Sequence, residues 1–319
     1  MTALRLGLIG AGRWGRRYIH TLNGMSDVGL ARLASRNSES PGLVPAGCVV
    51  TPNWREVAGD TSLDGVILAT PPALHAEMAE VAMAAGVPVL VEKPLTLSLV
   101  EAQRLMCRSM EVGCLAMVGH THLFSAAFRA LKEQAAVLGP LREIRSAGGN
   151  WGPCRSDTPM LWDWAPHDIS MCLDLVGAGP VAVDARQVST AILPEGEGEA
   201  VEMELGFPGG IRAGIRISNI DRHKTRRFEA YCEEGTLVYD DLSAEKLCIL
   251  PHGGGNRFPV PIDPSMPLSN LVAEFCAAIR VGLISHASLE LGLQVIQVLD
   301  HCQQALDRVV ASPVSSGKC

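Results

Sequence analysis

The chain has 319 residues, of which 47% are hydrophobic and 19% are charged. This length exceeds one ordinary hydrophobic core and predicts two domains, while the apolar content excludes extensive disorder. The net charge of -7 excludes a general basic surface for nucleic acid or for an anionic membrane. We therefore expect neither of these as a partner.

The ten cysteines form no CxxC pair, so they predict neither a zinc site nor a disulfide framework. The N-terminal apolar run from Leu4 to Ile9 is too short for a signal peptide. The sequence also contains no run of about 18 apolar residues, the length needed to span a bilayer. We expect a cytoplasmic protein whose cysteines are reduced.

Short apolar runs alternate with helical segments over the first 120 or so residues. The runs are typical of buried strands and fall at 4–9, 28–34, 48–50, 65–69, 87–91 and 115–118. Because strands that alternate with helices form parallel sheets, residues 1–122 are predicted to be an α/β domain with a doubly wound parallel sheet.

The first predicted strand runs directly into Gly10-Ala11-Gly12-Arg13-Trp14-Gly15, a GxGxxG sequence that opens a helix. In this position the pattern predicts a Rossmann dinucleotide site. Gly10 allows the tight turn, Gly12 lets the pyrophosphate approach and Gly15 lets the helix pack on the strand. Arg13 and Trp14 lie within the same turn. The alternative is an ordinary strand-to-helix turn.

No acidic residue follows the second predicted strand, where an NAD-binding domain usually has one for the adenosine ribose. Ser35 and Arg36 occupy this position instead. A hydroxyl and a guanidinium suit a 2'-phosphate, so we predict NADP as the preferred cofactor, with NAD as the other choice. A solvated turn with an incidental arginine is the alternative.

Several candidate ligand-binding residues gather where the later strands of this sheet end. They are Thr70, Pro71, Glu92, Lys93, His120 and His122. Ligands of open parallel sheets bind at this edge, so Lys93 is expected near the nicotinamide, although it could be only a surface lysine. His120 and His122 lack an acidic partner nearby in the sequence, which favours a substrate or nicotinamide contact over a metal site.

Three segments resemble the Gfo/Idh/MocA oxidoreductases: the glycine-rich turn, the segment from Ala69 to His75, and Glu92-Lys93-Pro94. The resemblance implies that Lys93 contacts the reacting substrate oxygen, and that His75 and Glu92 belong to the cofactor site. It also implies that a DxxxH pattern supplies an aspartate and a catalytic histidine. In this chain the pattern falls on Asp163 and His167.

Pro166 predicts the first turn of a helix, which would place His167 near the helix start and Asp163 just before it. An imidazole there tends to stay neutral and can take a proton from an alcohol. The alternatives are that Asp163 caps the helix and that His167 is a hydrogen-bonded core residue.

Several polar and aromatic residues surround this pattern and are predicted to bind a sugar-like substrate, because flat rings stack on sugar faces. They are Asn150, Trp151, Arg155, Trp162 and Trp164. A rim loop that merely packs is the alternative. The basic run 222–227 is predicted to be a solvated loop between strands, with a phosphate-bearing partner as the alternative.

Residues 123–311 are predicted to form a second, α+β domain that binds substrate, with residues 312–319 as a loose tail. A helix is expected over 124–138, and apolar residues alternate with period two over 201–207, 211–217, 228–232 and 237–239. This pattern predicts a mostly antiparallel, open-faced sheet, followed by closing helices over 269–281 and 288–310. The resemblance implies a homo-oligomer formed through this sheet.

These features predict an NAD(P)-dependent dehydrogenase or reductase acting on a sugar, polyol or sugar-derivative hydroxyl/ketone pair. The alternative is a non-catalytic NAD(P)-binding regulator, which has no need for Lys93, Asp163 and His167 together. A short-chain dehydrogenase is excluded, because no tyrosine in the sequence is followed by lysine four residues later.

Overall fold

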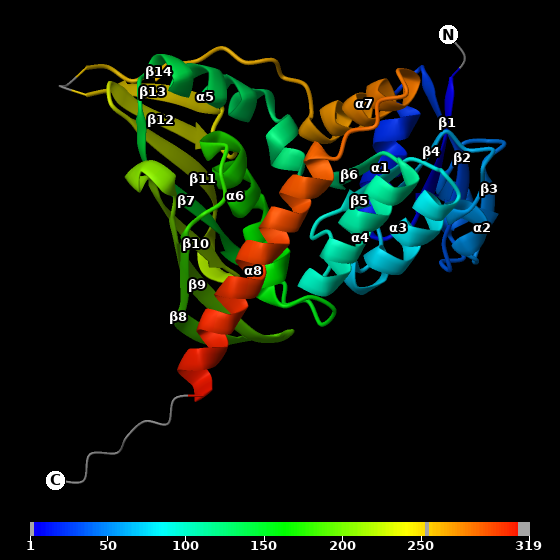
Figure 1. The fold of residues 1–319 in the computed structure, drawn as a ribbon, viewed down its shortest axis with the longest axis horizontal. Coiled ribbons are helices and arrows are strands. Elements are labelled where there is room, and N and C mark those ends of the chain that lie inside the picture. Colours follow the sequence, from blue (N-terminus) through cyan, green and yellow to red (C-terminus); the bar gives the residue numbers. More distant parts are fainter. Residues whose placement is uncertain (1–2, 253–254, 312–319) are drawn as a thin grey trace. The chain divides into compact units, whose positions relative to one another are not determined.

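The computed structural model describes residues 3–252 and 255–311, and Figure 1 shows its ribbon. The chain forms two compact units. The first comprises Met1–Ser125 and Ser265–Ile296, and the second comprises Ala126–Pro264 and Gln297–Cys319. The tail predicted over 312–319 lies outside the described residues.

The first unit contains a six-stranded parallel sheet in the order β3-β2-β1-β4-β5-β6. Its strands are β1 (Leu4–Ile9), β2 (Val28–Ala34), β3 (Val49–Thr51), β4 (Gly65–Leu68), β5 (Val89–Glu92) and β6 (Ala116–Gly119). The strand order reverses between β1 and β4, so a ligand crevice is expected beyond the carboxyl ends of these strands. The predicted Rossmann fold is confirmed.

Helices connect these strands: α1 (Arg13–Asn23), α2 (Arg55–Ala58), α3 (His75–Ala84) and α4 (Leu99–Val112). The core between the sheet and α1 includes Leu6, Leu8 and Leu22, all nearly inaccessible to solvent. Ser98 begins α4 by accepting a hydrogen bond from the Glu101 amide, and Gly113 ends the helix in the left-handed conformation with φ +60°.

The chain returns to the first unit through α7 (Pro267–Arg280). The apolar residues of this helix recur at helical spacing and join the core of β1 and α1. They include Leu268, Leu271, Val272 and Phe275. This segment was predicted to belong to the second domain, because periodicity shows that a helix has an apolar face but not which core receives it.

The second unit contains an eight-stranded sheet in the order β14-β13-β12-β11-β7-β10-β9-β8. Its strands are β7 (Leu141–Trp151), β8 (Ala182–Leu193), β9 (Gly196–Gly206), β10 (Arg212–Ser218), β11 (Ile220–Cys232), β12 (Gly235–Asp240), β13 (Leu247–Pro251) and β14 (Phe258–Pro259). Among the described strands of this second sheet, only the β7–β10 pair is parallel, which confirms the mostly antiparallel sheet.

Helices α5 (Ala126–Val137) and α6 (Met160–Val176) pack on one face of this sheet (Figure 1). Phe128 of α5 meets Phe228 of β11 edge to face, with ring centres 5.8 Å apart. A long helix, α8 (Ala287–Ala311), follows α7 and ends the described chain.

Four strands of the second unit, β7, β8, β13 and β14, were not predicted from the sequence, and two of them show why. On the buried face of β7, Ser146, Gly148 and other small residues interrupt the apolar alternation. Strand β8 lies at the sheet edge and is mostly exposed, so burial imposes little alternation on it.

The basic run 222–227 was predicted to be a loop, and this prediction is wrong. It lies within β11, where Thr225, Arg226 and Arg227 pair with β7. The charges concealed the strand because they lie on both faces of the sheet near its end.

Candidate functional site

The glycine-rich turn connects β1 to α1, and its three glycines have different reasons to be glycine. Gly10 has φ +101°, and a Cβ there would lie 2.4 Å from the Ala69 carbonyl oxygen. A Cβ on Gly15 would lie 2.0 Å from the Gly10 carbonyl oxygen. Both glycines are therefore required by the fold itself.

Gly12 is different, because nothing lies within 4 Å of the position of its Cβ and its φ of -71° suits any residue. The chain thus leaves open space at the amino end of α1, which has no acidic side chain in its first turn. Backbone amides and the helix dipole favour an anion there. The residues present fit the pyrophosphate of a dinucleotide.

Arg13 is exposed in the first turn of α1, whereas Trp14 packs partly against the core of the first unit. The Arg17 guanidinium stacks over the Trp14 ring, 4.6 Å from its centre. Trp14 therefore helps to fix the start of α1. At the end of β2, Ser35 accepts a 2.7 Å hydrogen bond from the Ser40 hydroxyl, and Arg36 is exposed.

His75 lies at the start of α3 and is completely buried. Its Nδ1 is 2.9 Å from the Pro94 carbonyl oxygen, and its Nε2 is 3.0 Å from the Thr70 carbonyl oxygen. The ring therefore links the segments that follow β4 and β5. Thr70 is half-buried and Pro71 is exposed at the same edge of the sheet.

Glu92 is the last residue of β5 and lies in the interior. Its Oε1 accepts a 2.7 Å hydrogen bond from the Tyr18 hydroxyl, and its Oε2 accepts a 3.1 Å bond from the Lys93 amide. Burial raises the pKa of Glu92, although both hydrogen bonds and the Lys93 charge oppose the rise. Tyr18 belongs to the structural support of Lys93, and no local sequence signal identified it.

Gly119 lies opposite Glu92 in the β5–β6 register. A Cβ on Gly119 would lie 3.1 Å from Glu92 Oε1, so the glycine leaves room for the carboxyl group. The half-buried Lys93 follows Glu92 at the carboxyl edge of the sheet, as predicted.

His120 follows β6 and is only 1% exposed. Neither of its ring nitrogens has a hydrogen-bond partner among the described residues. Burial and the nearby Lys93 charge lower the pKa of His120 to about 3, so the ring is neutral at physiological pH. Buried ring nitrogens are usually hydrogen-bonded, so those of His120 are available to water, a cofactor or a substrate. His122 lies in the following turn and is half-buried.

In the second unit, Asp163 and His167 both lie within α6. The helix begins at Met160, so the prediction that it starts at Pro166 is wrong. Pro159 precedes the first turn, and its carbonyl accepts the first helical hydrogen bond, 3.0 Å from the Asp163 amide. Asp163 and His167 are four residues apart and therefore share one side of the helix.

The helix start changes two earlier interpretations. Asp163 lies in the first turn and is not the capping residue, and the buried His167 lies beyond that turn. The helix dipole acts mainly within the first turn, so it contributes less at His167 than we expected. Pro166 lies inside the helix and cannot donate the hydrogen bond that another residue would make there.

Arg155 is paired with two carboxylates. It donates two 2.9 Å hydrogen bonds to Asp157 and one 3.2 Å bond to Asp163. The Asp157 hydrogen bonds, with the Asp163 charge, raise the pKa of Arg155, so its charge is fixed and largely neutralised by these partners.

A cavity of about 190 Å³ opens beside this group within the second unit. Its polar lining includes Arg155, Thr158, Asp163, Glu197, Glu199 and Asn219. Trp164 also lines it, whereas Trp162 is buried and donates a 3.2 Å hydrogen bond to Gln303 Oε1. Asn150 and Trp151 end β7, and the Trp151 side chain is half exposed.

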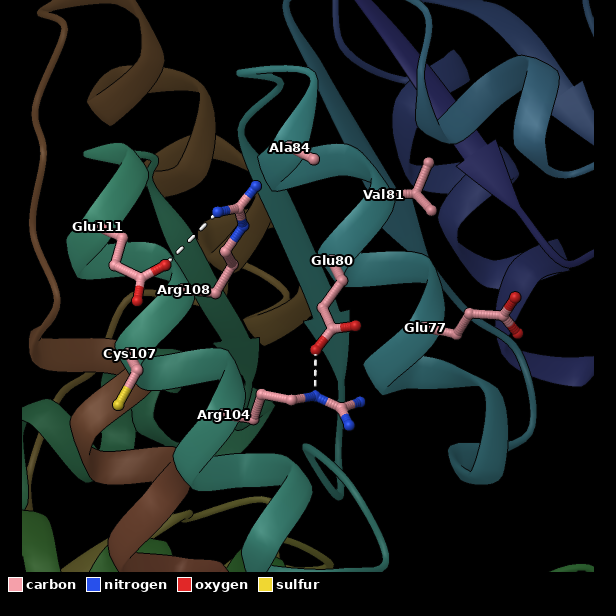
Figure 2. Close-up of a pocket in the computed structure, with 8 residues that line it drawn as sticks. All are labelled: Glu77, Glu80, Val81, Ala84, Arg104, Cys107, Arg108 and Glu111. Atoms are coloured by element: carbon pink, nitrogen blue, oxygen red, sulfur yellow. Dashed lines mark hydrogen bonds and ion pairs between the residues drawn. The ribbon is translucent and has the colours of Figure 1, made fainter.

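A larger surface groove, of about 490 Å³, lies between α3 and α4 in the first unit (Figure 2). Arg104 and Glu80 form an ion pair across it, and Arg108 pairs with Glu111. None of the predicted site residues lines this groove, so it does not belong to the candidate site.

The described residues contain no group of three or more histidine, cysteine and acidic side chains that could hold a metal ion. Among the same residues, no helix has the length and apolar character to cross a membrane.

Comparisons with known proteins match both units. A family model described as "Oxidoreductase family, NAD-binding Rossmann fold" matches residues 4–120, and the "GFO/IDH/MocA C-terminal domain" matches residues 128–238. A 4-carboxy-2-hydroxymuconate-6-semialdehyde dehydrogenase from Sphingobium sp. is 30% identical, over 96% of this chain and 99% of that protein.

A UDP-N-acetylglucosamine 3-dehydrogenase from Acidithiobacillus ferrooxidans is 28% identical, over 82% of this chain and 81% of that protein. A solved structure from Magnetospirillum magnetotacticum MS-1 is 42% identical, with a TM-score of 0.89, over 94% of this chain and 100% of that one. Other relatives are inositol dehydrogenases, and both NAD- and NADP-dependent enzymes occur among them.

Proposed function

The chain belongs to the Gfo/Idh/MocA oxidoreductase family, and we propose that it interconverts a hydroxyl and a ketone on a sugar, polyol or sugar derivative. The observation that carries this proposal is the open space at Gly12. Gly12 follows β1 and Lys93 follows β5, so both lie at the carboxyl ends of strands of the same parallel sheet. When bound, a nicotinamide cofactor supplies or accepts the hydride. Gly12 and the backbone amides at the start of α1 would hold its pyrophosphate, while Gly10 and Gly15 allow the turn and the packing of α1.

Three side chains carry the proton and charge chemistry. In the oxidation direction, His167 takes the proton of the substrate hydroxyl as the carbon loses its hydride. Lys93 donates a hydrogen bond to the same oxygen and stabilises the negative charge that develops there. Asp163 orients the substrate or His167. In reduction, His167 returns the proton.

His120 contributes a neutral ring to this chemistry. A neutral imidazole offers one donor and one acceptor, which matches a carboxamide or a hydroxyl group. We assign its unpaired nitrogens to the nicotinamide or the substrate, and we place His122 in the same contact region.

The lining of the cavity in the second unit supports a proposal for the class of substrate. It contains three carboxylates, on Asp163, Glu197 and Glu199, and its guanidinium on Arg155 is already paired. Carboxylates accept hydrogen bonds from hydroxyls but repel anions. The cavity therefore favours an uncharged polyol or sugar over a multiply anionic substrate.

We propose NADP as the preferred cofactor, because Ser35 and the exposed Arg36 end β2 without a neighbouring acidic residue at that position. We further propose that copies of the chain associate through the open face of the eight-stranded sheet. This face carries ion pairs such as Arg145–Glu143 and Arg227–Glu229. Light scattering on the purified chain measures the mass of the assembly. The cytoplasmic location stays a prediction.

A substrate panel tests the proposed function. We expect NADP⁺ reduction with myo-inositol or glucose, and little with UDP-N-acetylglucosamine, as measured by absorbance. His167→Asn should abolish the activity and keep cofactor binding. Cofactor binding without turnover of any panel member would favour the regulator interpretation.

A further inference from the structure

Arg226 lies on β11 within the basic run, and its side chain is on the same face of the sheet as Phe228, against the helices. The side chain is 18% exposed, compared with 45% for the neighbouring Arg227. A largely buried guanidinium needs a charged or aromatic partner, because taking it out of water is unfavourable.

Arg226 has two partners, and both belong to α6. Its Nη1 is 3.4 Å from Oδ2 of Asp168, and its guanidinium carbon is 5.6 Å from the centre of the Trp164 ring. Asp168 is buried, and its other oxygen accepts a 2.5 Å hydrogen bond from the Ser146 hydroxyl of β7. One side chain of the sheet thus contacts two residues of the helix.

These two residues have a specific relation to the assigned catalytic pair. Trp164 directly follows Asp163, and Asp168 directly follows His167. We propose that Arg226 is a positioning residue that fixes the rotation of α6 and thereby the directions of Asp163 and His167. This inference rests on the proposed function, because it takes the catalytic roles of those two residues from it.

The sheet is built to leave space for this guanidinium. Gly148 lies opposite Arg226 in the β7–β11 register. A Cβ on Gly148 would lie 2.8 Å from Nη1 of Arg226 and 3.5 Å from Oδ2 of Asp168. Any side chain at this position would push Arg226 away from the helix.

The helix itself explains why an external contact is needed at this point. Pro166 lies between Asp163 and His167 and has no amide hydrogen, so the helix lacks one of its own hydrogen bonds there. A helix is easier to bend where such a bond is missing. Arg226 holds the helix on both sides of this weak point, at Trp164 and at Asp168.

Four variants test the proposal: Arg226→Met, Arg226→Lys, Gly148→Ala and, as a matched control, Arg142→Met. The control removes an exposed arginine of β7, whose ion pair with Glu233 does not involve α6. The measurements are kcat and KM for the panel polyol that wild type oxidises fastest, KM for NADP⁺, and deuterium exchange of α6. Since a displacement of about 1 Å can lower a rate about 100-fold, we expect kcat of Arg226→Met to fall about 10- to 100-fold.

The same variant should keep KM for NADP⁺ within about twofold and show faster exchange over residues 160–168. Arg226→Lys should recover part of kcat, Gly148→Ala should lose activity with its arginine intact, and Arg142→Met should match wild type. If Arg226→Met does not fold, Arg226→Lys and Gly148→Ala decide the question.

Wild-type kcat and exchange in Arg226→Met would overturn the proposal, as would equal losses in Arg142→Met. His167→Asn separates the two levels of inference. If that variant stays active, the proposed catalytic role fails; if it is inactive while Arg226→Met is normal, only the positioning role fails.

Discussion

The Tyr18 hydroxyl donates a 2.7 Å hydrogen bond to Oε1 of Glu92 in the interior of the first unit. The pair joins α1, which begins at the glycine-rich turn, to the end of β5, which carries Lys93. The proposed phosphate-binding and charge-stabilising elements are therefore connected by one buried contact.

Removing the hydroxyl in Tyr18→Phe should lower the free energy of unfolding by about 1–3 kcal/mol, because Glu92 keeps its burial but loses a donor. Urea unfolding measures the change. Tyr231→Phe is the matched control, since Tyr231 donates a 2.6 Å bond to Glu229 in a more exposed position. If Tyr18→Phe loses no more unfolding free energy than Tyr231→Phe, burial does not strengthen the contribution of the Tyr18 hydrogen bond.

Glu92 should make stability depend on pH. Burial raises its pKa above the ordinary 4.5, so the folded protein holds the proton more tightly than the unfolded chain. The contribution of Glu92 is therefore complete below pH 4.5 and is lost as the pH rises through the folded-state pKa. Relative to Glu92→Gln, wild type should lose stability as the pH rises from about 4.5 to neutrality. Urea unfolding measures the difference in unfolding free energy between the two proteins at each pH. A difference that stays constant across this range would refute the raised pKa of Glu92.

The glycines of the turn should separate cofactor binding from folding. Gly12→Ala meets no protein atom within 4 Å, so its unfolding midpoint should match wild type. Its new methyl group enters the space left for the pyrophosphate and should weaken NADP⁺ binding about tenfold or more, which is about 1.4 kcal/mol. Calorimetric titration measures the affinity. Gly15→Ala should instead destabilise the fold, because its Cβ would clash with the Gly10 carbonyl oxygen. Unchanged NADP⁺ affinity in Gly12→Ala would exclude the glycine-rich turn as the pyrophosphate site.

Lys93→Met should reduce turnover by a factor of about 10² to 10⁴ while NADP⁺ affinity stays close to that of wild type. The reason is that the ammonium acts on charge that develops only during the reaction. Steady-state kinetics with the panel substrate measures the effect. Lys132→Met, which removes a surface lysine paired with Asp174, is the control. Unchanged turnover in Lys93→Met would remove Lys93 from the mechanism.

Arg36→Ala should raise KM for NADP⁺ about tenfold and leave KM for NAD⁺ nearly unchanged, since only NADP⁺ carries the 2'-phosphate. The ratio of the two values, measured on one preparation, is the test. Arg13 directly follows Gly12 at the start of α1. Arg13→Ala should therefore change KM for NADP⁺ and KM for NAD⁺ to the same extent. A clear NAD⁺ preference in wild type would show that the prediction from Ser35 and Arg36 is wrong.

Local patterns in the sequence determined much of the first unit. The strand from Leu4 to Ile9 and the glycine spacing after it were predicted because burial and backbone freedom act on neighbouring residues. The position of Lys93 at the end of β5 followed from the same reasoning. The start of α6 was not predicted, because Pro159 and Pro166 both suit a helix start and only the structure shows that Pro159 precedes the first turn.

The tertiary structure alone decided which distant residues support the site. Tyr18 is 74 residues from Glu92, and Arg226 is 58 residues from Asp168. Strand order and register create these contacts, and buried polar groups accept them because an unpaired charge or hydroxyl in the interior is unfavourable. The sequence by itself determined where the chemically active side chains occur, since each follows a local pattern, whereas their partners depended on how separate strands and helices pack.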